Sequence, residues 1–149
     1  MKALSVKQPS ASYVAEGLKP IEIRSWATDH RGKLLIVASA APKNIFFHDT
    51  EYNEHLLLPA GGIVGIVNLV DCRPMRKGDE KAAMCDFDPS VYAWVVEPIT
   101  ICRPVKILGK LHLYDVPDEL IVPLKKSEWL WQFPMPQGDV KYTKACPVI

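Results

Sequence analysis

The sequence contains no apolar run near the ~20 residues that a membrane-spanning helix requires, so no membrane span is expected. Its first ten residues, MKALSVKQPS, hold too short an apolar stretch for a secretory signal peptide. An excess of one charge is also lacking. The net charge is +1, so the chain as a whole does not attract nucleic acid or anionic membranes, and any such attraction must come from a local group of residues. These absences favour a cytoplasmic protein.

Cysteines are few and widely spread, and no C-x-x-C pair occurs among Cys72, Cys85, Cys102 and Cys146. Structural zinc sites usually show tighter ligand spacing, so free thiols in a reducing compartment are expected. His48 and His55 are seven residues apart, about two turns, and could share a helix face. Two histidines alone rarely form a metal site. No metal, flavin or nucleotide-cofactor motif occurs, so no cofactor is expected.

The composition is that of an ordinary packed protein, with 48% apolar and 23% charged residues among 149. A chain of this length forms one domain and buries about two-thirds of the surface that its unfolded form exposes. There are no internal repeats, low-complexity tracts or linkers that would divide it. We therefore predict a single domain over residues 1–149.

Apolar patterning predicts several short strands and two helices. The strands are expected at residues 2–6, 21–25, 33–39, 63–72 and 91–100, with two more between 104 and 116 that break at Gly109. A short helix is expected over 8–17, closed by Gly17, and a longer one over 43–57. Gly65 indicates a bulge or tight bend, and Pro98 a strand edge or bulge. This order predicts the α+β class, with a small mixed β-barrel and about two covering helices.

The stretch GLKPIEIRSW, residues 17–26, places three charges within six positions. Glu22 and Arg24 alternate with isoleucines, so their side chains share one face of the predicted strand. The ordinary interpretation is a solvent-facing ion pair on a half-exposed sheet, worth at most ~1 kcal/mol. The alternative is a ligand site.

Neighbouring residues favour the ligand site. Gly17 allows a tight turn in which the backbone can approach a ligand, and Pro20 keeps Lys19 extended. Trp26 and Arg31 add an indole and a second guanidinium, which together with Lys19 can stack a base and bind a phosphate. The motif charges meet only if the turn before the strand resets the alternation. If the strand already begins at Lys19, this ammonium lies on the isoleucine face instead.

Four residues of this stretch follow the pattern G-x-K-x-x-E-x-R: Gly17, Lys19, Glu22 and Arg24. The flanks add a Ser-x-x-Gln-Pro start (Ser5, Gln8, Pro9), R-S-W after the motif and R-G before the next apolar strand. Later stretches, GGIVGIVNLVDC, YAWVVEP and GKLHLYDV, also fit. With this combination the sequence resembles the ASCH domain family, which has a PUA-like barrel. The resemblance covers about residues 3–116, taken as the domain core, and leaves a C-terminal extension.

The resemblance implies a cleft in the barrel that the motif lines, with RNA or a nucleotide-like molecule as the ligand. It also implies a second kind of function, because some family members are hydrolases: an amidohydrolase that acts on acetylated cytidine, and ribonucleases. In the amidohydrolase branch the motif lysine is catalytic, and a threonine stands where this chain has Glu22.

The first hypothesis is a module that binds RNA or a nucleotide-like small molecule. Lys19, Arg24 and Arg31 would bind phosphate, while Trp26 or Trp94 would stack a base. Glu22 would orient the cations or accept a base amino group. The remaining members of the predicted binding set are Ser5, Gln8 and Gly17. Trp94 fits a core position equally well, and Ser5 and Gln8 could instead cap the helix that follows them.

The second hypothesis is a small hydrolase. Lys19, partly desolvated and near Arg24, would act as base or nucleophile, and Glu22 would hold it or activate water. These three are the predicted catalytic residues, and no metal ligand is predicted. A third alternative is a domain that recruits a protein partner through the aromatic residues Tyr114, Trp129, Trp131 and Phe133, although aromatic residues near a C-terminus more often close a core.

Overall fold

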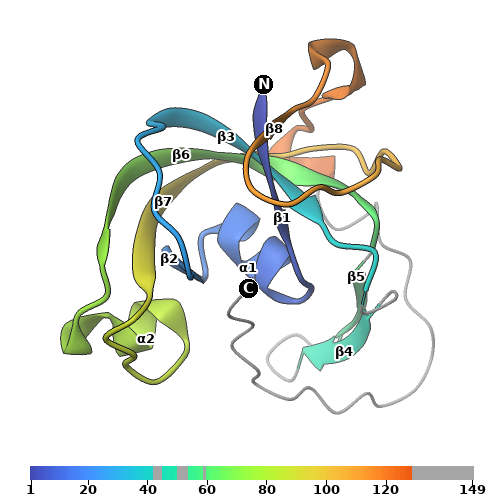
Figure 1. Ribbon diagram of the computed structural model, residues 1–149. Coiled ribbons are helices and arrows are strands. Elements are labelled where there is room, and N and C mark those ends of the chain that lie inside the picture. Colours follow the sequence, from blue (N-terminus) through green and yellow to red (C-terminus); the bar gives the residue numbers. More distant parts are fainter. Residues whose placement is uncertain (42–44, 50–53, 59, 129–149) are drawn as a thin grey trace.

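Six strands form one curled, mixed sheet in the computed structural model, which describes residues 1–41, 45–49, 54–58 and 60–128 (Figure 1). The order is β2-β7-β6-β3-β1-β8. The bounds are β1 (Lys2–Val6), β2 (Ile21–Arg24), β3 (Gly32–Ala38), β6 (Gly62–Pro74), β7 (Tyr92–Ile101) and β8 (Tyr114–Asp115). β1 pairs parallel with β3, and the other pairings in this sheet are antiparallel. The sheet curls into a half-barrel, so the predicted α+β barrel class is confirmed.

Helix α1 (Ser10–Glu16) lies inside the curve of the sheet, whereas α2 (Glu80–Ala83) lies at its edge (Figure 1). α1 ends at Gly17, whose φ of +86° is the left-handed conformation that glycine adopts most readily. Gly65 lets the helix approach the sheet. A Cβ at this position would lie 3.0 Å from the Cβ of Ala15 and 2.7 Å from the carbonyl oxygen of Thr100. The described residues also include three single-turn 3-10 helices: η1 (Lys77–Asp79), η2 (Asp118–Leu120) and η3 (Lys126–Glu128).

Strand β3 is buried on both faces, as its nearly continuous apolar sequence predicts. Leu34 and Ile36 pack with α1 and Trp94 in one hydrophobic cluster. Leu35 and Val37 point the other way, into a second cluster that includes Tyr114. The sheet therefore separates two apolar layers. A third cluster, around Ile21, Ile23, Met75, Ala83, Val91 and Ala93, joins β2 to the α2 region.

The bends predicted at Gly65 and Pro98 are confirmed. The register of β3 with β6 shifts between Ile36 and Val37, opposite Gly65. The register of β6 with β7 shifts between Ile66 and Val67, and Val67 pairs with Pro98. An extra residue on one strand increases its local bend, which lets the two long strands follow the curve of the half-barrel.

The helix predicted over residues 43–57 is wrong. β4 (Ile45–Asp49) and β5 (Glu54–Leu58) form a two-stranded antiparallel hairpin instead. His48 pairs with His55 across the hairpin, so the two histidines do not share a helix face. The run Ile45-Phe46-Phe47 explains the difference, because β-branched and aromatic residues favour strands over helices. Within the described ranges, no group of three or more His, Cys, Asp or Glu is placed to hold a metal ion.

The two strands predicted between residues 104 and 116 are also mostly absent from the described fold. Only β8 and an isolated bridge between Gly62 and Lys106 form there. The expectation that Trp129, Trp131 and Phe133 cap the core falls outside the described residues. None of the helices in the described part of the chain is long and apolar enough to cross a membrane.

Candidate functional site

The turn between α1 and β2 brings Lys19 to Glu22. After Gly17, the backbone N–H of Lys19 donates to the carbonyl oxygen of Tyr13 (3.1 Å), and β2 begins only at Ile21. The side-chain alternation is thus reset before the strand. Lys19 Nζ lies 3.3 Å from Glu22 Oε1, so the condition for the motif charges to meet is fulfilled.

This ion pair is almost completely buried. The side chains of Lys19 and Glu22 are 2% and 1% exposed. Lys19 Nζ also lies 3.4 Å from Ser10 Oγ, and Glu22 Oε1 accepts from the N–H of Ile23 at 2.9 Å. The ordinary interpretation, a solvent-facing ion pair, is therefore wrong. A buried pair carries a desolvation cost of several kcal/mol per ion, which good geometry and further hydrogen bonds must offset.

Arg24 adds a second buried cation, and the cluster leaves polar atoms unpaired. Arg24 is 4% exposed. Burial lowers the pKa of its guanidinium, and the negative charge of Glu22 partly opposes this shift. Within the described structure, Arg24 Nε and Glu22 Oε2 are buried and have no hydrogen-bond partner. Two cations and one carboxylate give the cluster a net charge of +1, with one donor and one acceptor unused. An unpaired buried group of this kind costs about 1–3 kcal/mol or more.

Arg24 connects this cluster to a cavity of about 290 Å³. Its other lining residues are Ser5, Ser39, Ala40, Leu108, Gly109, Lys110 and Leu111. Ser5 lies on β1 and Ser39 directly follows the parallel strand β3, so two hydroxyl groups come from the same end of neighbouring strands. The lining thus offers two cations and two hydroxyls and no carboxylate. This chemistry suits an anion, and the volume is at the lower end of the ~300–1,000 Å³ typical of small-molecule sites.

The loop before β8 closes the cavity over Ser5. Ser5 Oγ and the Tyr114 hydroxyl lie 2.7 Å apart and share a hydrogen bond. Burial raises the pKa of Tyr114, while hydrogen bonds from Ser5 and from the backbone of Lys110 partly oppose the shift. A Cβ on Gly109 would come within 2.8 Å of Ser5 Oγ, so the loop can lie this close because residue 109 has no side chain. Leu108 and Leu111 are each 82% exposed beside it.

The two candidate tryptophans have different positions. Trp94 is fully buried in the main core, and its Nε1–H donates to the carbonyl oxygen of Trp26 at 3.1 Å. Of the two positions considered for Trp94, in the core or in the cleft, the structure shows the core position. Trp26 is half-buried. Its ring packs edge-on against Trp94 at 4.7 Å between centroids and against His112 at 4.8 Å, and His112 belongs to the loop that closes the cavity.

Arg31 is not brought to the cluster. It is exposed just before β3, whereas Ser39 follows the opposite end of that strand. Its guanidinium donates to the carbonyl oxygens of Thr28 and His30, and lies 3.8 Å from Asp71. These contacts make Arg31 a local structural residue at the opposite end of β3 from the cavity residue Ser39.

Gln8 and Gly17 have structural roles. Gln8 Nε2 donates to Ser12 Oγ, and Gln8 Oε1 accepts from the N–H of Ser12, which satisfies a donor in the first turn of α1. A Cβ on Gly17 would lie 2.8 Å from Pro98, so the close approach at this glycine is to the protein itself. Gly17 also lines a larger hollow of about 840 Å³ with Leu18, Pro20, Gly78, Glu80, Lys81, Ala82 and Met84.

Sequence reasoning missed Ser39 and Lys110 as members of the site. Only the fold brings these two residues to the cavity. Ser39 lies at the end of a strand parallel to β1, and Lys110 lies beside Gly109 in the loop before β8. The serine directly after a buried strand was a usable signal. The parallel pairing of β1 with β3 was not readable from the pattern, because the strands are separated by α1 and β2.

Two comparisons with known proteins agree with this architecture. The ASCH domain profile matches residues 4–122, which is most of the chain, so the protein belongs to the ASCH domain family of PUA-like folds. Activating signal cointegrator 1 from Homo sapiens is 35% identical over 92 residues, and its counterpart from Mus musculus is 33% identical over 92 residues. Each match covers 52% of this chain and 15% of the relative, so the chain spans a small part of the length of these proteins.

Proposed function

We propose that this ASCH domain binds RNA or a nucleotide, with a phosphate in the cavity between Arg24 and Lys110. The observation that carries the proposal is the buried cluster with net charge +1, whose Arg24 has an unpaired Nε and lines a cavity without carboxylates. An anion there would meet two cations and the hydroxyls of Ser5 and Ser39.

In this proposal Glu22 stabilises the charge of Arg24, and Lys19 pairs with Glu22. Neither is among the lining residues of the cavity, and both are almost fully buried. Glu22 offsets part of the charge of the two cations. Its unpaired Oε2 is buried and outside the cavity lining, so the predicted acceptance of a base amino group is left out of the proposal. Trp26 is the aromatic residue retained for base contact. Arg31 and Trp94 are left out, because one is held by Asp71 and the other is buried in the core.

A small hydrolase is the second candidate, and the observation that favours it is the 3.3 Å contact between Lys19 and Glu22. To act as a base or nucleophile, the Lys19 ammonium must first lose a proton, and Glu22 is placed to receive it. Binding is preferred to hydrolysis because of the burial of these two groups. Both groups are buried and neither lines the cavity, so a substrate in the cavity would not reach Lys19 without rearrangement.

The binding proposal is tested by calorimetric titration with uridine 5′-monophosphate (UMP) and uridine at low salt. Arg24→Gln is expected to weaken UMP binding at least tenfold, and Lys110→Gln severalfold, because each removes a cation from the phosphate. Uridine, which lacks the phosphate, should bind more weakly than UMP. Arg31→Gln is the matched control, since it removes an exposed guanidinium outside the cavity, and should change the affinity by less than twofold. Equal UMP affinity of wild type and Arg24→Gln would refute the proposal.

The hydrolase candidate needs a separate assay. The protein is incubated with N4-acetylcytidine and with RNA, and the products are separated by chromatography. Turnover that Lys19→Ala abolishes would support the hydrolase, whereas turnover that survives this change would remove Lys19 from the mechanism. A cytoplasmic location and a single domain over residues 1–149 stay predictions of the sequence.

A further inference from the structure

The segment that leads into β8 concentrates positive charge. Between Glu97 and Asp115 the sequence contains Arg103, Lys106 and Lys110 and no aspartate or glutamate. All three cations are exposed, and none forms an ion pair with another described residue. In a chain with a net charge of only +1, this is a local concentration of positive charge that no overall charge excess explains.

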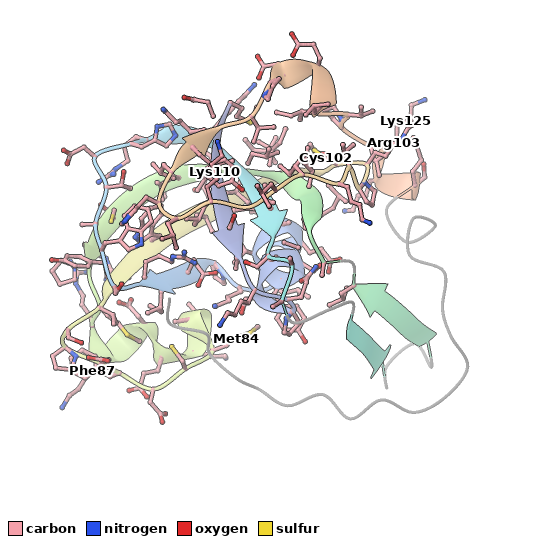
Figure 2. All side chains as sticks on the ribbon, turned by 45° about the vertical axis from the view of Figure 1, so that its right-hand side comes forward. Met84, Phe87, Cys102, Arg103, Lys110 and Lys125 are labelled. Carbon is pink, nitrogen blue, oxygen red and sulfur yellow. The ribbon has the colours of Figure 1, made fainter. Side chains whose placement is uncertain are left out.

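Backbone contacts hold this segment on the fold. The N–H of Arg103 donates to the carbonyl oxygen of Val122 at 2.8 Å, and Lys106 forms a bridge with Gly62. Figure 2 shows the labelled Arg103 and Lys110 on the upper part of the molecule, away from Met84, which follows α2. Arg103 therefore lies on the same upper part of the fold as Lys110, which lines the Arg24 cavity.

We propose that this segment, residues 103–111, is a track for single-stranded RNA that leads out of the cavity. The inference rests on the proposed function, because one nucleotide occupies the cavity at Arg24 and Lys110. The neighbouring phosphates then lie along Lys106 and Arg103. Leu108 and Leu111, each 82% exposed beside Lys110, give apolar surfaces against which flanking bases pack.

The dimensions and the site favour a single-stranded polymer over a free nucleotide or a duplex. Residues 103 to 110 can extend over at most ~25 Å, which is far more than one nucleotide requires. A base that contacts Trp26 while its phosphate occupies the cavity has to be unstacked and unpaired, as it is in single-stranded RNA. Single-strand sites of about 4–16 nucleotides are typical of small barrel domains. An anionic membrane is the less suitable partner, since the segment is irregular and forms no amphipathic helix.

The test separates the track from the cavity with the double variant Arg103→Gln/Lys106→Gln, which leaves every cavity residue unchanged. Its control is Lys33→Gln/Lys77→Gln, which removes two exposed charges at the start of β3 and in η1. Binding of UMP and of 5′-phosphorylated oligouridines of 2, 4 and 8 nucleotides is measured between 50 and 200 mM salt. Circular dichroism confirms that each variant is folded.

Wild type is expected to bind the octamer at least tenfold more tightly than UMP. The track variant should keep its UMP affinity and lose this gain, and its plot of log K against log salt should flatten by ~1.4, since each phosphate contact to a single strand contributes ~0.7. The control variant should behave as wild type. UMP binding without a gain in affinity with length would overturn the track and leave the cavity proposal intact. Failure of both UMP and oligomers to bind would overturn both.

A third arm uses vesicles of phosphatidylcholine with 20% phosphatidylserine. No vesicle binding, together with the gain in affinity for longer oligouridines, supports the RNA track. Vesicle binding that the track variant loses, in a protein without that gain, would assign the segment to an anionic membrane and refute the proposal.

Discussion

Replacing Glu22 by glutamine removes the one negative charge from the buried cluster and leaves two cations, Lys19 and Arg24, without an anionic partner. The side chains of the Lys19–Glu22 pair are no more than 2% exposed, and Arg24 is 4% exposed, so solvent cannot screen this change. Removing one member of a buried pair costs about 3–5 kcal/mol. Glutamine keeps an oxygen that can accept from Ile23 and Lys19, so we expect the lower end, about 3 kcal/mol.

For a domain of this size, a loss of about 3 kcal/mol corresponds to a fall in the midpoint temperature of roughly 6–12 °C. Urea unfolding at pH 7 measures the free energy directly, and thermal unfolding provides the second readout. Lys19→Met should cost less than Glu22→Gln, because Glu22 then remains paired with the charge of Arg24. The double variant Lys19→Met/Glu22→Gln restores the original net charge of the cluster and should recover at least about 1 kcal/mol of the Glu22→Gln loss. A cost below about 0.5 kcal/mol for Glu22→Gln would refute the electrostatic reasoning.

Two substitutions and one chemical-labelling experiment test other parts of the fold. Gly65→Ala should lower the free energy of unfolding by about 2 kcal/mol in urea titrations, because the new Cβ would lie 2.7 Å from the carbonyl oxygen of Thr100; an unchanged midpoint would contradict this packing. The Arg73 guanidinium, which donates to both carboxylate oxygens of Asp79, holds the pKa of Asp79 below its usual value. The ionised Asp79 therefore stabilises the folded protein above pH ~4, and this stabilisation is lost as the pH falls further. Asp79→Asn should lower the free energy of unfolding at pH 7. Unfolding curves measured at a series of pH values should also show a smaller loss of stability in acid for this variant than for wild type. Burial raises the pKa of Cys102 to about 11, so at pH 8 only ~0.1% of this thiol is ionised, and mass spectrometry after iodoacetamide treatment should find it unmodified until the protein unfolds.

The sequence predicted the elements that carry strong periodic patterns. The alternation of IEIRS, the continuous apolar run of β3 and the glycine that ends α1 each correspond to a described element. The helix over 43–57 failed because spacing alone does not separate a helix from two short apolar strands, and the preference of Ile45-Phe46-Phe47 for strands outweighed it.

The candidate site was predictable only in part. The motif identified Lys19, Glu22 and Arg24. Their burial depends on the turn after α1, and the alternation of apolar and charged residues does not predict the geometry of this turn. Ser39 and Lys110 join Arg24 because a parallel strand and a returning loop meet there. The position of Ser39 after a buried strand was a local signal, but the long-range pairing that brings these residues together was not readable from the sequence pattern. Arg31 is near Arg24 in the sequence, but it lies at the opposite end of β3 from the cavity residue Ser39. Only the fold reveals this separation.

The side-chain Nε–H resonance of Arg24 provides the most direct measurement of the binding site, because this atom is buried without a partner and belongs to a residue that lines the cavity. In a ¹⁵N-labelled sample, the resonance is assigned by its loss in Arg24→Lys, and UMP is then titrated. Our account predicts a saturable shift of the Arg24 signal with the Arg31 signal unchanged. An Arg24 signal that stays in place while UMP binds, or that moves no more than the signal of Arg31, would contradict it.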